Sequence, residues 1–159
     1  MPSSECFREM MDGRVKTLHP KIHAGILANR KIEEHLQEAK EQGIKLIDLV
    51  IVNLYPFKET IPKPHSLDEA VEKIDIGGST MLRAAAKNFE SVAVIVDPKD
   101  YSEVIKELKE NQKELSENTR KKLMVKVFGF TAFHDSIISN YFRENFFPEQ
   151  FPEKISLGF

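Results

Sequence analysis

The sequence predicts an α/β fold with a parallel sheet flanked by helices, and three observations lead to this prediction. Two runs rich in β-branched residues, 46–53 and 91–96, are typical of strands buried on both faces of a parallel sheet. Helical patterns lie between and after these runs, and strands that alternate with helices favour parallel pairing. Only two convincing strands are present, which is too few for a covered sheet. We therefore expect the back portion of an α/β domain, with its N-terminal strands missing.

The composition indicates a chain that can bury a core of its own. Its 159 residues are 41% hydrophobic and 30% charged. The net charge of -2 argues against a protein that coats nucleic acid and against a polybasic membrane binder. No apolar run reaches the ~18 residues of a membrane span. The single cysteine, Cys6, can form no internal disulfide, so we expect a cytoplasmic protein.

Helices are predicted from apolar spacing and from capping residues. Residues 30–42 form a surface helix that Gly43 ends, and three prolines make a loop of the segment after the first strand. A capping box, Ser66 to Glu69, opens a helix that extends through about Lys73. The glycines of residues 75–78 break it. The next helices are predicted at 80–87, 101–110 and 116–141.

The last predicted helix and the tail carry most of the aromatic side chains. Phe128 and Phe133 widen the apolar stripe of the helix, and eight of the eleven phenylalanines lie between Phe128 and Phe159. A cluster of this kind marks either a contact surface or a tail packed on its own core.

Residues 14–20 (RVKTLHP) form the first candidate site. Arg14 and Lys16 alternate, and Thr17 and His19 add a hydroxyl and an imidazole. Two cations with nearby donors suit a phosphate or another oxyanion. Taken alone, the segment fits a solvated basic loop equally well.

The second and third candidate sites follow the first strand and precede the helix at 80–87. Asn53 and Tyr55 stand at the end of the strand, where ligands of open parallel sheets bind, although a turn with an aromatic plug is the commoner arrangement. Gly77 and Gly78 allow close approach of a ligand to the backbone. Asp75 and Lys87 make a plausible acid/base pair.

No metal site is predicted, because the histidines show no paired ligand spacing. Pro20 is expected to disrupt a helix that would bring His19 and His23 together, and His134 is one of several scattered histidines. Cys6 has no activating partner and is expected to be structural or free.

Three long motifs, residues 12–27, 53–57 and 75–88, together resemble the inosine monophosphate (IMP) cyclohydrolase domain. In that family the domain belongs to a bifunctional purine enzyme that also carries AICAR formyltransferase. The resemblance implies a methylglyoxal-synthase-like fold and a homodimer. It also implies a cyclohydrolase domain over 1–145 without its first ~50 residues, which bear a phosphate cradle, and the start of a linker to the absent transformylase domain over 146–159. Ser79 stands where a proline is common in the family.

The family reaction closes the ring of 5-formamidoimidazole-4-carboxamide ribotide to give IMP and water. It uses no metal or cofactor, since 10-formyltetrahydrofolate serves only the transformylase domain. Motif matching assigns proton transfer to Lys87 and stabilisation of the oxyanion to Lys16. Asp75 would set the charge of Lys87 and orient the carboxamide. Tyr55 and Asn53 would hold the base and the formyl group. The nucleotide site would be lined by Arg14, Val15, Thr17, Ile76 and Gly77.

Two alternatives to an active enzyme stay open. One is a non-catalytic folding or dimerisation unit, which the missing phosphate cradle favours. The other is a regulatory domain that binds a phosphorylated effector, against which the acid/base set argues. We expect the chain alone to close the ring poorly, because binding energy from a remote phosphate normally positions the reacting atoms.

Overall fold

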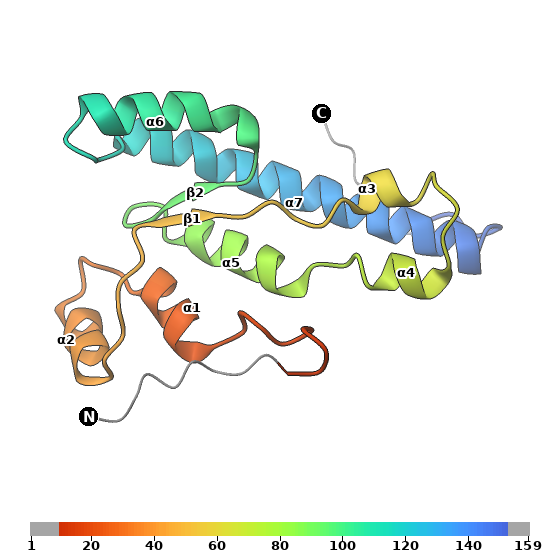
Figure 1. Cartoon of the computed structure of the whole chain (residues 1–159), viewed down its shortest axis with the longest axis horizontal. Coiled ribbons are helices and arrows are strands. Elements are labelled where there is room, and N and C mark those ends of the chain that lie inside the picture. Colours follow the sequence, from red (N-terminus) through yellow and green to blue (C-terminus); the bar gives the residue numbers. More distant parts are fainter. Residues whose placement is uncertain (1–9, 153–159) are drawn as a thin grey trace.

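Two short parallel strands lie at the centre of the chain, and helices cover them (Figure 1). The structure is a computed structural model, and it describes residues 10–152. Strand β1 (Leu49–Ile51) pairs in parallel with β2 (Ala93–Ile95), with Val50 opposite Val94. The predicted α/β class, the number of strands and their parallel direction are confirmed, although each strand is shorter than its β-branched run.

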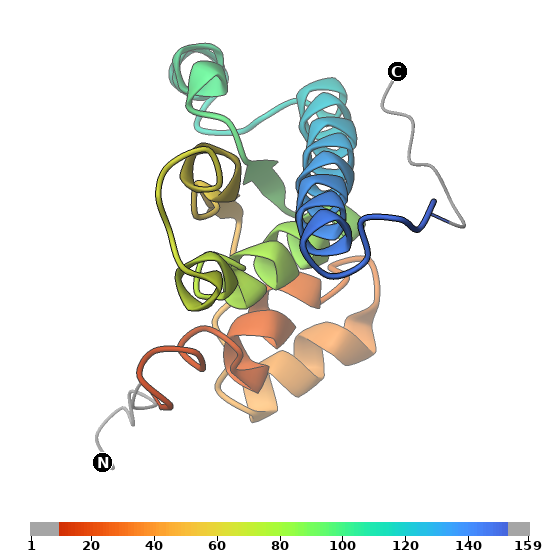
Figure 2. The same ribbon diagram turned by 90° about the vertical axis from the view of Figure 1, so that its right-hand side faces the viewer.

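The helices of the described residues follow in chain order. They are α1 (Pro20–Leu27), α2 (Glu33–Glu41), α3 (Phe57–Thr60), α4 (Leu67–Val71), α5 (Ile76–Lys87), the 3-10 turn η1 (Pro98–Asp100), α6 (Tyr101–Glu110) and α7 (Glu117–Phe146). Figures 1 and 2 show α6 on one side of the strands and α5 and then α1 in successive layers on the other, with α7 alongside. None of these helices, α7 included, combines the length and the hydropathy that a bilayer crossing needs.

Helix α1 begins at the proline that the sequence predicts to disrupt a helix. Proline occupies the first helical position, where its missing N–H costs no intrahelical hydrogen bond. His19 is the N-cap, and its Nδ1 accepts a hydrogen bond from the Lys21 N–H at 3.1 Å. The prediction that Pro20 keeps His19 and His23 off a common helix start is therefore wrong.

Helix α5 begins four residues earlier than predicted. The Asp75 side chain accepts a hydrogen bond from the Gly78 N–H at 2.6 Å, as an aspartate N-cap does. The two glycines thus lie in the first turn of α5, so the prediction that residues 75–78 break the preceding helix is wrong: α4 already ends at Val71. In contrast, the capping box of Ser66 and Glu69 at the start of α4 is confirmed.

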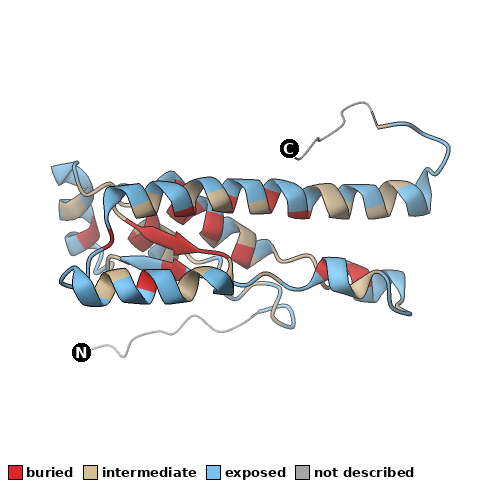
Figure 3. Ribbon diagram, turned by 90° about the horizontal axis from the view of Figure 1, so that it is seen from above, coloured by how far each residue is buried: buried red, intermediate tan, exposed pale blue. Residues whose placement is uncertain are grey.

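The core has two parts that meet at β2, as Figure 3 shows by the buried residues around the strands. One face of β2 packs with Val50, Leu82 and Val127, and the other with Val104 and Leu123. Strand β2 is buried on both faces, as predicted. Strand β1 is not, because Leu49 and Ile51 keep 36% and 49% of their surface exposed.

Helix α7 buries a narrower stripe than its sequence predicts. Phe128 and Phe133 are 36% and 51% exposed, so they do not widen the apolar face. Instead, each ring lies against a cation: the Arg83 guanidinium is 5.6 Å from the centre of Phe128, and Lys58 Nζ is 5.2 Å from that of Phe133. Phe147 and Phe151 are also exposed, and residues 153–159 of the predicted linker lie outside the described part of the chain.

Lys126 ties α7 to the segment after β2. Its Nζ lies 2.8 Å from carboxylate oxygens of both Asp97 and Asp100. The hydrogen bond from Lys126 lowers the pKa of Asp97, and Asp100 followed by Asp97 raises the pKa of Lys126. Because the pKa of Asp97 is lower in the folded chain, its ion pair stabilises the fold at pH values above the pKa of the unfolded chain, and this stabilisation is lost as the pH falls through the pKa of the folded chain. Because the pKa of Lys126 is higher in the folded chain, its contribution is complete at pH values below the pKa of the unfolded chain and is lost as the pH rises through the pKa of the folded chain.

Replacing Lys126 by glutamine should therefore lower the melting temperature by an amount that depends on pH. The difference from the unaltered chain should be constant between about pH 5 and 9, and should shrink below about pH 3 and above about pH 11. Thermal unfolding followed by circular dichroism across this range measures it, with exposed Lys106→Gln as the matched control. A difference that persists unchanged at pH 2 would contradict the ion-pair explanation.

Candidate functional site

The three predicted motif segments meet at the connection between α4 and α5. The hydroxyl of Thr17 approaches Gly77 so closely that a Cβ on Gly77 would overlap with it. Arg14 forms an ion pair with Glu72, and Lys73 Nζ lies 5.9 Å from the ring centre of Tyr55. The cationic loop, the segment after β1 and the start of α5 are therefore one site.

A tight reversal of the backbone presents the cationic loop. Met10 and Val15 form an antiparallel bridge. Of the four residues between them, the first three, Met11 to Gly13, have positive φ angles. The Arg14 side chain is 65% exposed, and the side chain of its partner Glu72 is 56% exposed. An exposed pair of this kind contributes about 0–1 kcal/mol. A phosphate could therefore replace Glu72 as the partner of Arg14 at small cost.

The two candidate site residues that follow β1, Asn53 and Tyr55, contact different parts of the chain. Tyr55 is 56% exposed and faces Lys73, at the edge of the site. The Asn53 amide nitrogen instead donates a hydrogen bond to the hydroxyl of Tyr101 at 3.3 Å. Both residues lie just past the carboxyl end of the strand, as predicted for a ligand site. Asn53 has a partner on α6 in this structure.

Asp75 is the charged residue closest to the start of α5. Its carboxylate lies at the positive end of the helix dipole and is half-buried. A Cβ on Gly78 would come within 2.6 Å of this carboxylate, so the glycine leaves room for it. Ile76 beside it is 56% exposed. The Asp75 carboxylate is thus fixed at the N-terminus of α5, and Thr17 contacts the first turn of this helix at Gly77.

Lys87 lies at the opposite end of α5. It lies twelve positions after Asp75, which corresponds to about 18 Å along a helix axis. Asn88 anchors this end to α1, because its amide nitrogen donates hydrogen bonds to the carbonyls of Ile26 and Ala28 at 2.7 and 2.9 Å. The structure therefore does not bring Asp75 and Lys87 together within one chain, since the helix between them is continuous.

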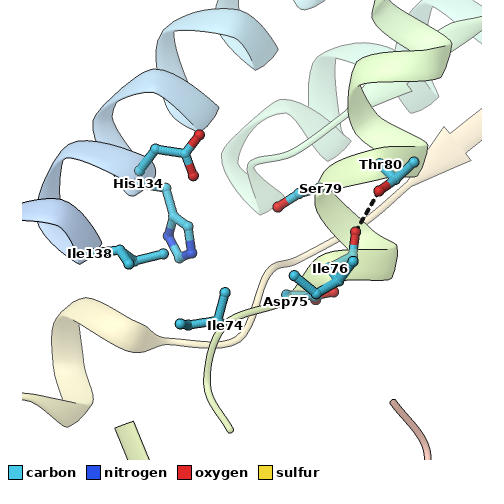
Figure 4. A pocket seen from close by; sticks show the side chains of 8 residues that line it. Ile74, Asp75, Ile76, Ser79, Thr80, His134 and Ile138 are labelled. Atoms are coloured by element: carbon cyan, nitrogen blue, oxygen red, sulfur yellow. Dashed lines mark hydrogen bonds between the residues drawn. The ribbon is translucent and has the colours of Figure 1, made fainter. Parts of the chain in front are cut away.

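A cavity of about 180 Å³ lies between the first turn of α5 and the middle of α7 (Figure 4). Its lining residues are Ile74, Asp75, Ile76, Ser79, Thr80, His134, Asp135 and Ile138. Asp75 and Ile76 belong both to this cavity and to the predicted site, so the two are continuous.

His134 is the residue of this cavity that sequence reasoning missed. The sequence analysis describes it as one of several scattered histidines, yet it follows Leu123, Val127 and Thr131 on the buried stripe of α7. A histidine at helical spacing within an otherwise buried stripe was the available signal. Within residues 10–152, no three side chains of His, Cys, Asp or Glu gather closely enough to hold a metal ion.

The contact between Thr17 and Gly77 leads to a stability prediction. Gly77→Ala should destabilise the chain by about 1–3 kcal/mol, because the new methyl group overlaps with the Thr17 hydroxyl. In a Thr17→Ala background the same change should stabilise by about 0.5–1 kcal/mol, since alanine is the better helix former. Urea unfolding of the four chains gives both values.

Gly129→Ala is the control, because nothing lies within 4 Å of its Cβ position in α7. It should stabilise the chain in either background. Destabilisation by Gly77→Ala that survives the loss of the Thr17 hydroxyl would show that the two segments do not touch there.

Comparison with known proteins agrees with the motifs. Residues 85–159 match the AICARFT/IMPCHase bienzyme family, and residues 4–80 match the MGS-like domain. The bifunctional purine biosynthesis protein PurH of Acetivibrio thermocellus is 56% identical over 154 residues, which are 96% of this chain and 30% of that protein. PurH of Staphylococcus carnosus is 57% identical over 148 residues, again 30% of its length. The chain thus spans about 30% of the length of these relatives.

A solved structure supports the same relationship. The crystal structure of ForH superimposes with a TM-score of 0.72 at 38% sequence identity, covering 85% of this chain and 70% of that one. The observed strands and helices therefore have the arrangement of an MGS-like α/β domain. On these similarities, the chain belongs to the AICARFT/IMPCHase bienzyme family.

Proposed function

We propose that this chain serves purine nucleotide biosynthesis by closing the ring of 5-formamidoimidazole-4-carboxamide ribotide to inosine monophosphate. The observation that carries the proposal is the contact between Thr17 and Gly77, which joins the cationic loop to the start of α5. The names of the relatives, which are bifunctional purine biosynthesis proteins, give the pathway.

The reaction needs a base, an oxyanion partner and tight positioning. The carboxamide nitrogen attacks the formyl carbon, so a C–N bond forms and this nitrogen gives up one proton. The formamide nitrogen gives up a second proton as the C–O bond breaks, and the former formyl oxygen leaves as water. Asp75 orients the carboxamide, and Lys16 stabilises the oxyanion. Because both reacting groups belong to one molecule, holding them in near-attack geometry supplies much of the acceleration.

The remaining residues bind the nucleotide and the base. Arg14 and Thr17 face the phosphate and ribose, with Val15, Ile76 and Gly77 around them, and Tyr55 and Asn53 hold the base. Lys87 is assigned proton transfer by the motif match alone, since it lies at the far end of α5. Neither a metal nor an organic cofactor takes part, and 10-formyltetrahydrofolate serves only the transformylase activity. The active form is a cytoplasmic homodimer.

A chimera tests the function independently of chain length. This chain would replace the matching 154 residues of Acetivibrio thermocellus PurH, and ring closure would be followed by the absorbance change on IMP formation. We expect a rate within about tenfold of the parent, as for a site whose chemistry is retained. A folded chimera that still formylates but does not close the ring would overturn the proposal.

A further inference from the structure

Tyr101 lies beside Asn53 at the carboxyl edge of the sheet, and the reaction described above gives it no role. Because β1 and β2 are parallel, the chain leaves both strands at the same edge, towards α3 and towards α6 (Figure 1). Asn53 stands two residues after β1, and Tyr101 is the first residue of α6. The Asn53 amide nitrogen donates a hydrogen bond to the Tyr101 hydroxyl at 3.3 Å. This bond joins the two segments that leave the sheet.

The backbone next to Asn53 is held against β2. One residue earlier, the Val52 N–H donates a hydrogen bond to the Ile95 carbonyl at 3.0 Å. The Asn53 side chain is exposed, so without a partner it would sample several rotamers. The bond to Tyr101 restricts these rotamers before a ligand arrives, and a ligand then loses less binding energy in ordering the side chain.

The Tyr101 hydroxyl has a rigid support in turn η1 and in the core. Asp97 caps η1, because its side chain accepts a hydrogen bond from a backbone N–H of the turn at 3.0 Å. The ion pairs of Lys126 with Asp97 and Asp100 then hold the turn to α7. The Tyr101 ring is half-buried and packs against the part of the core that lies between β2 and α6. The position of the hydroxyl is therefore set by packing and by the turn.

The direction of the hydrogen bond determines which end of the Asn53 amide is left for a ligand. Nδ2 lies on the Tyr101 side, and Oδ1 accepts no hydrogen bond from the residues that the structure describes. An amide oxygen can only accept, so the ligand group that meets it has to carry an N–H or an O–H. The substrate of the proposed function carries N–H groups on its formamide and on its carboxamide.

We propose that Tyr101 is a positioning residue for ring closure: its hydroxyl holds the Asn53 amide so that Oδ1 accepts a hydrogen bond from an N–H of the bound substrate. The role rests on the proposed function, which assigns the base to Asn53 and Tyr55. Tyr101 acts through Asn53 and needs no contact with the substrate. When Oδ1 accepts a hydrogen bond, Nδ2 becomes a stronger donor, so the bond to Tyr101 should shorten in the complex.

The test replaces Tyr101 by phenylalanine in the chimera with Acetivibrio thermocellus PurH. Phenylalanine keeps the packing of the ring and removes only the hydroxyl. KM should rise about fivefold, as for the loss of one neutral hydrogen bond, while kcat should stay within about twofold. A purely structural loss would reduce the folded fraction of the enzyme, which lowers the apparent kcat and leaves KM unchanged. The split between KM and kcat therefore separates the two roles.

Tyr141→Phe is the matched control. The Tyr141 hydroxyl also has a single side-chain partner, His65 Nε2 at 2.8 Å, and neither residue belongs to the proposed site. This variant loses a hydrogen bond of the same kind, so it should lower the melting temperature about as much as Tyr101→Phe does. Its KM should equal that of the unaltered chimera.

A double variant shows whether Tyr101 acts through Asn53. Asn53→Ala should raise KM by about tenfold, because it removes the contact with the substrate itself. In this background Tyr101→Phe should leave KM unchanged, since the amide that it positions is gone.

NMR tests the contact without any activity. The three tyrosines are labelled with ¹³C, and the ring carbon that bears each hydroxyl is followed. Asn53→Ala should shift the signal of Tyr101 and leave that of Tyr141 in place. This measurement keeps the Tyr101 side chain, so it decides the matter even if Tyr101→Phe does not fold.

Three results would overturn the role of Tyr101. They are an unchanged KM in Tyr101→Phe, KM effects of Tyr101→Phe and Asn53→Ala that multiply in the double variant, and a Tyr101 signal that Asn53→Ala does not move. Each of the first two is measured in a chimera that closes the ring, so it leaves the proposed function intact. An unaltered chimera that folds and closes no ring removes the proposed function, and the role of Tyr101 in ring closure with it.

Discussion

The Asp75→Asn variant should fold normally and close the ring about 10²–10⁴-fold more slowly in the chimera with the Acetivibrio thermocellus protein. Asparagine is as good an N-cap as aspartate, so its side-chain oxygen can still accept the hydrogen bond from the Gly78 N–H. What the variant loses is the negative charge that lines the cavity between α5 and α7. A group that orients and polarises the carboxamide needs that charge, whereas a purely structural cap does not.

Two further variants separate the roles of Asp75. Asp75→Ala removes the cap as well as the charge, so it should lower the free energy of unfolding by about 0.5–2 kcal/mol. Asp68→Asn is the control, because Asp68 is an exposed acidic residue in the first turn of α4. Thermal unfolding and the absorbance assay are measured on all three. A normal rate for Asp75→Asn would leave the carboxylate a helix cap only.

The fold was predictable where a local pattern decides it. Capping at Ser66, the amphipathic period of α6 and the β-branched run that becomes β2 each depend on neighbouring residues, and each prediction is confirmed. The burial of β1 was not predictable in this way. Its run resembles that of β2, but whether a second face is covered depends on segments distant in sequence, and Leu49 and Ile51 are exposed.

The errors near α1 and α5 arise from residues with two opposite effects. Pro20 ends a helix that precedes it but starts one that follows it, and His19 supplies the cap that decides between them. The glycines after Asp75 weaken a helix, yet in the first turn they make room for the capping carboxylate and for Thr17. Helix propensity alone does not weigh these effects, because side-chain caps at His19 and Asp75 and the close approach of Thr17 decide them.

The site was predictable as a set of segments and only partly as a geometry. The rule that ligands bind past the carboxyl ends of parallel strands predicts a role for Tyr55, which lies near Lys73, and Thr17 contacts the nearby first turn of α5 at Gly77. The sequence could not show that Lys87 lies about 18 Å from Asp75, because it predicts a helix that begins only at residue 80, and the observed helix α5 is continuous between the two residues. The helical spacing of His134 after Leu123, Val127 and Thr131 could have indicated its burial, whereas its position at the cavity depends on how α7 packs against α5.

Lys87→Ala should leave the fold intact and slow ring closure by about 10²–10⁴-fold if the motif match assigns its role correctly. The side chain is exposed at the last position of α5, where alanine is well tolerated and the lysine adds only about 0.3–1 kcal/mol through the helix dipole. Exposed Lys122 on α7 provides the control, since Lys122→Ala changes the same charge away from α5.

Lys87→Arg and a double variant define what Lys87 does. Arginine keeps the charge but does not give up its proton, so Lys87→Arg should be as slow as Lys87→Ala if Lys87 transfers a proton, and nearly normal if it supplies charge alone. Because about 18 Å of helix separates Asp75 from Lys87, the losses of Asp75→Asn and Lys87→Ala should multiply in the double variant. A double variant no slower than either single one would mean that the two act as a unit, and the separation along α5 would then have to be bridged by a second copy of the chain.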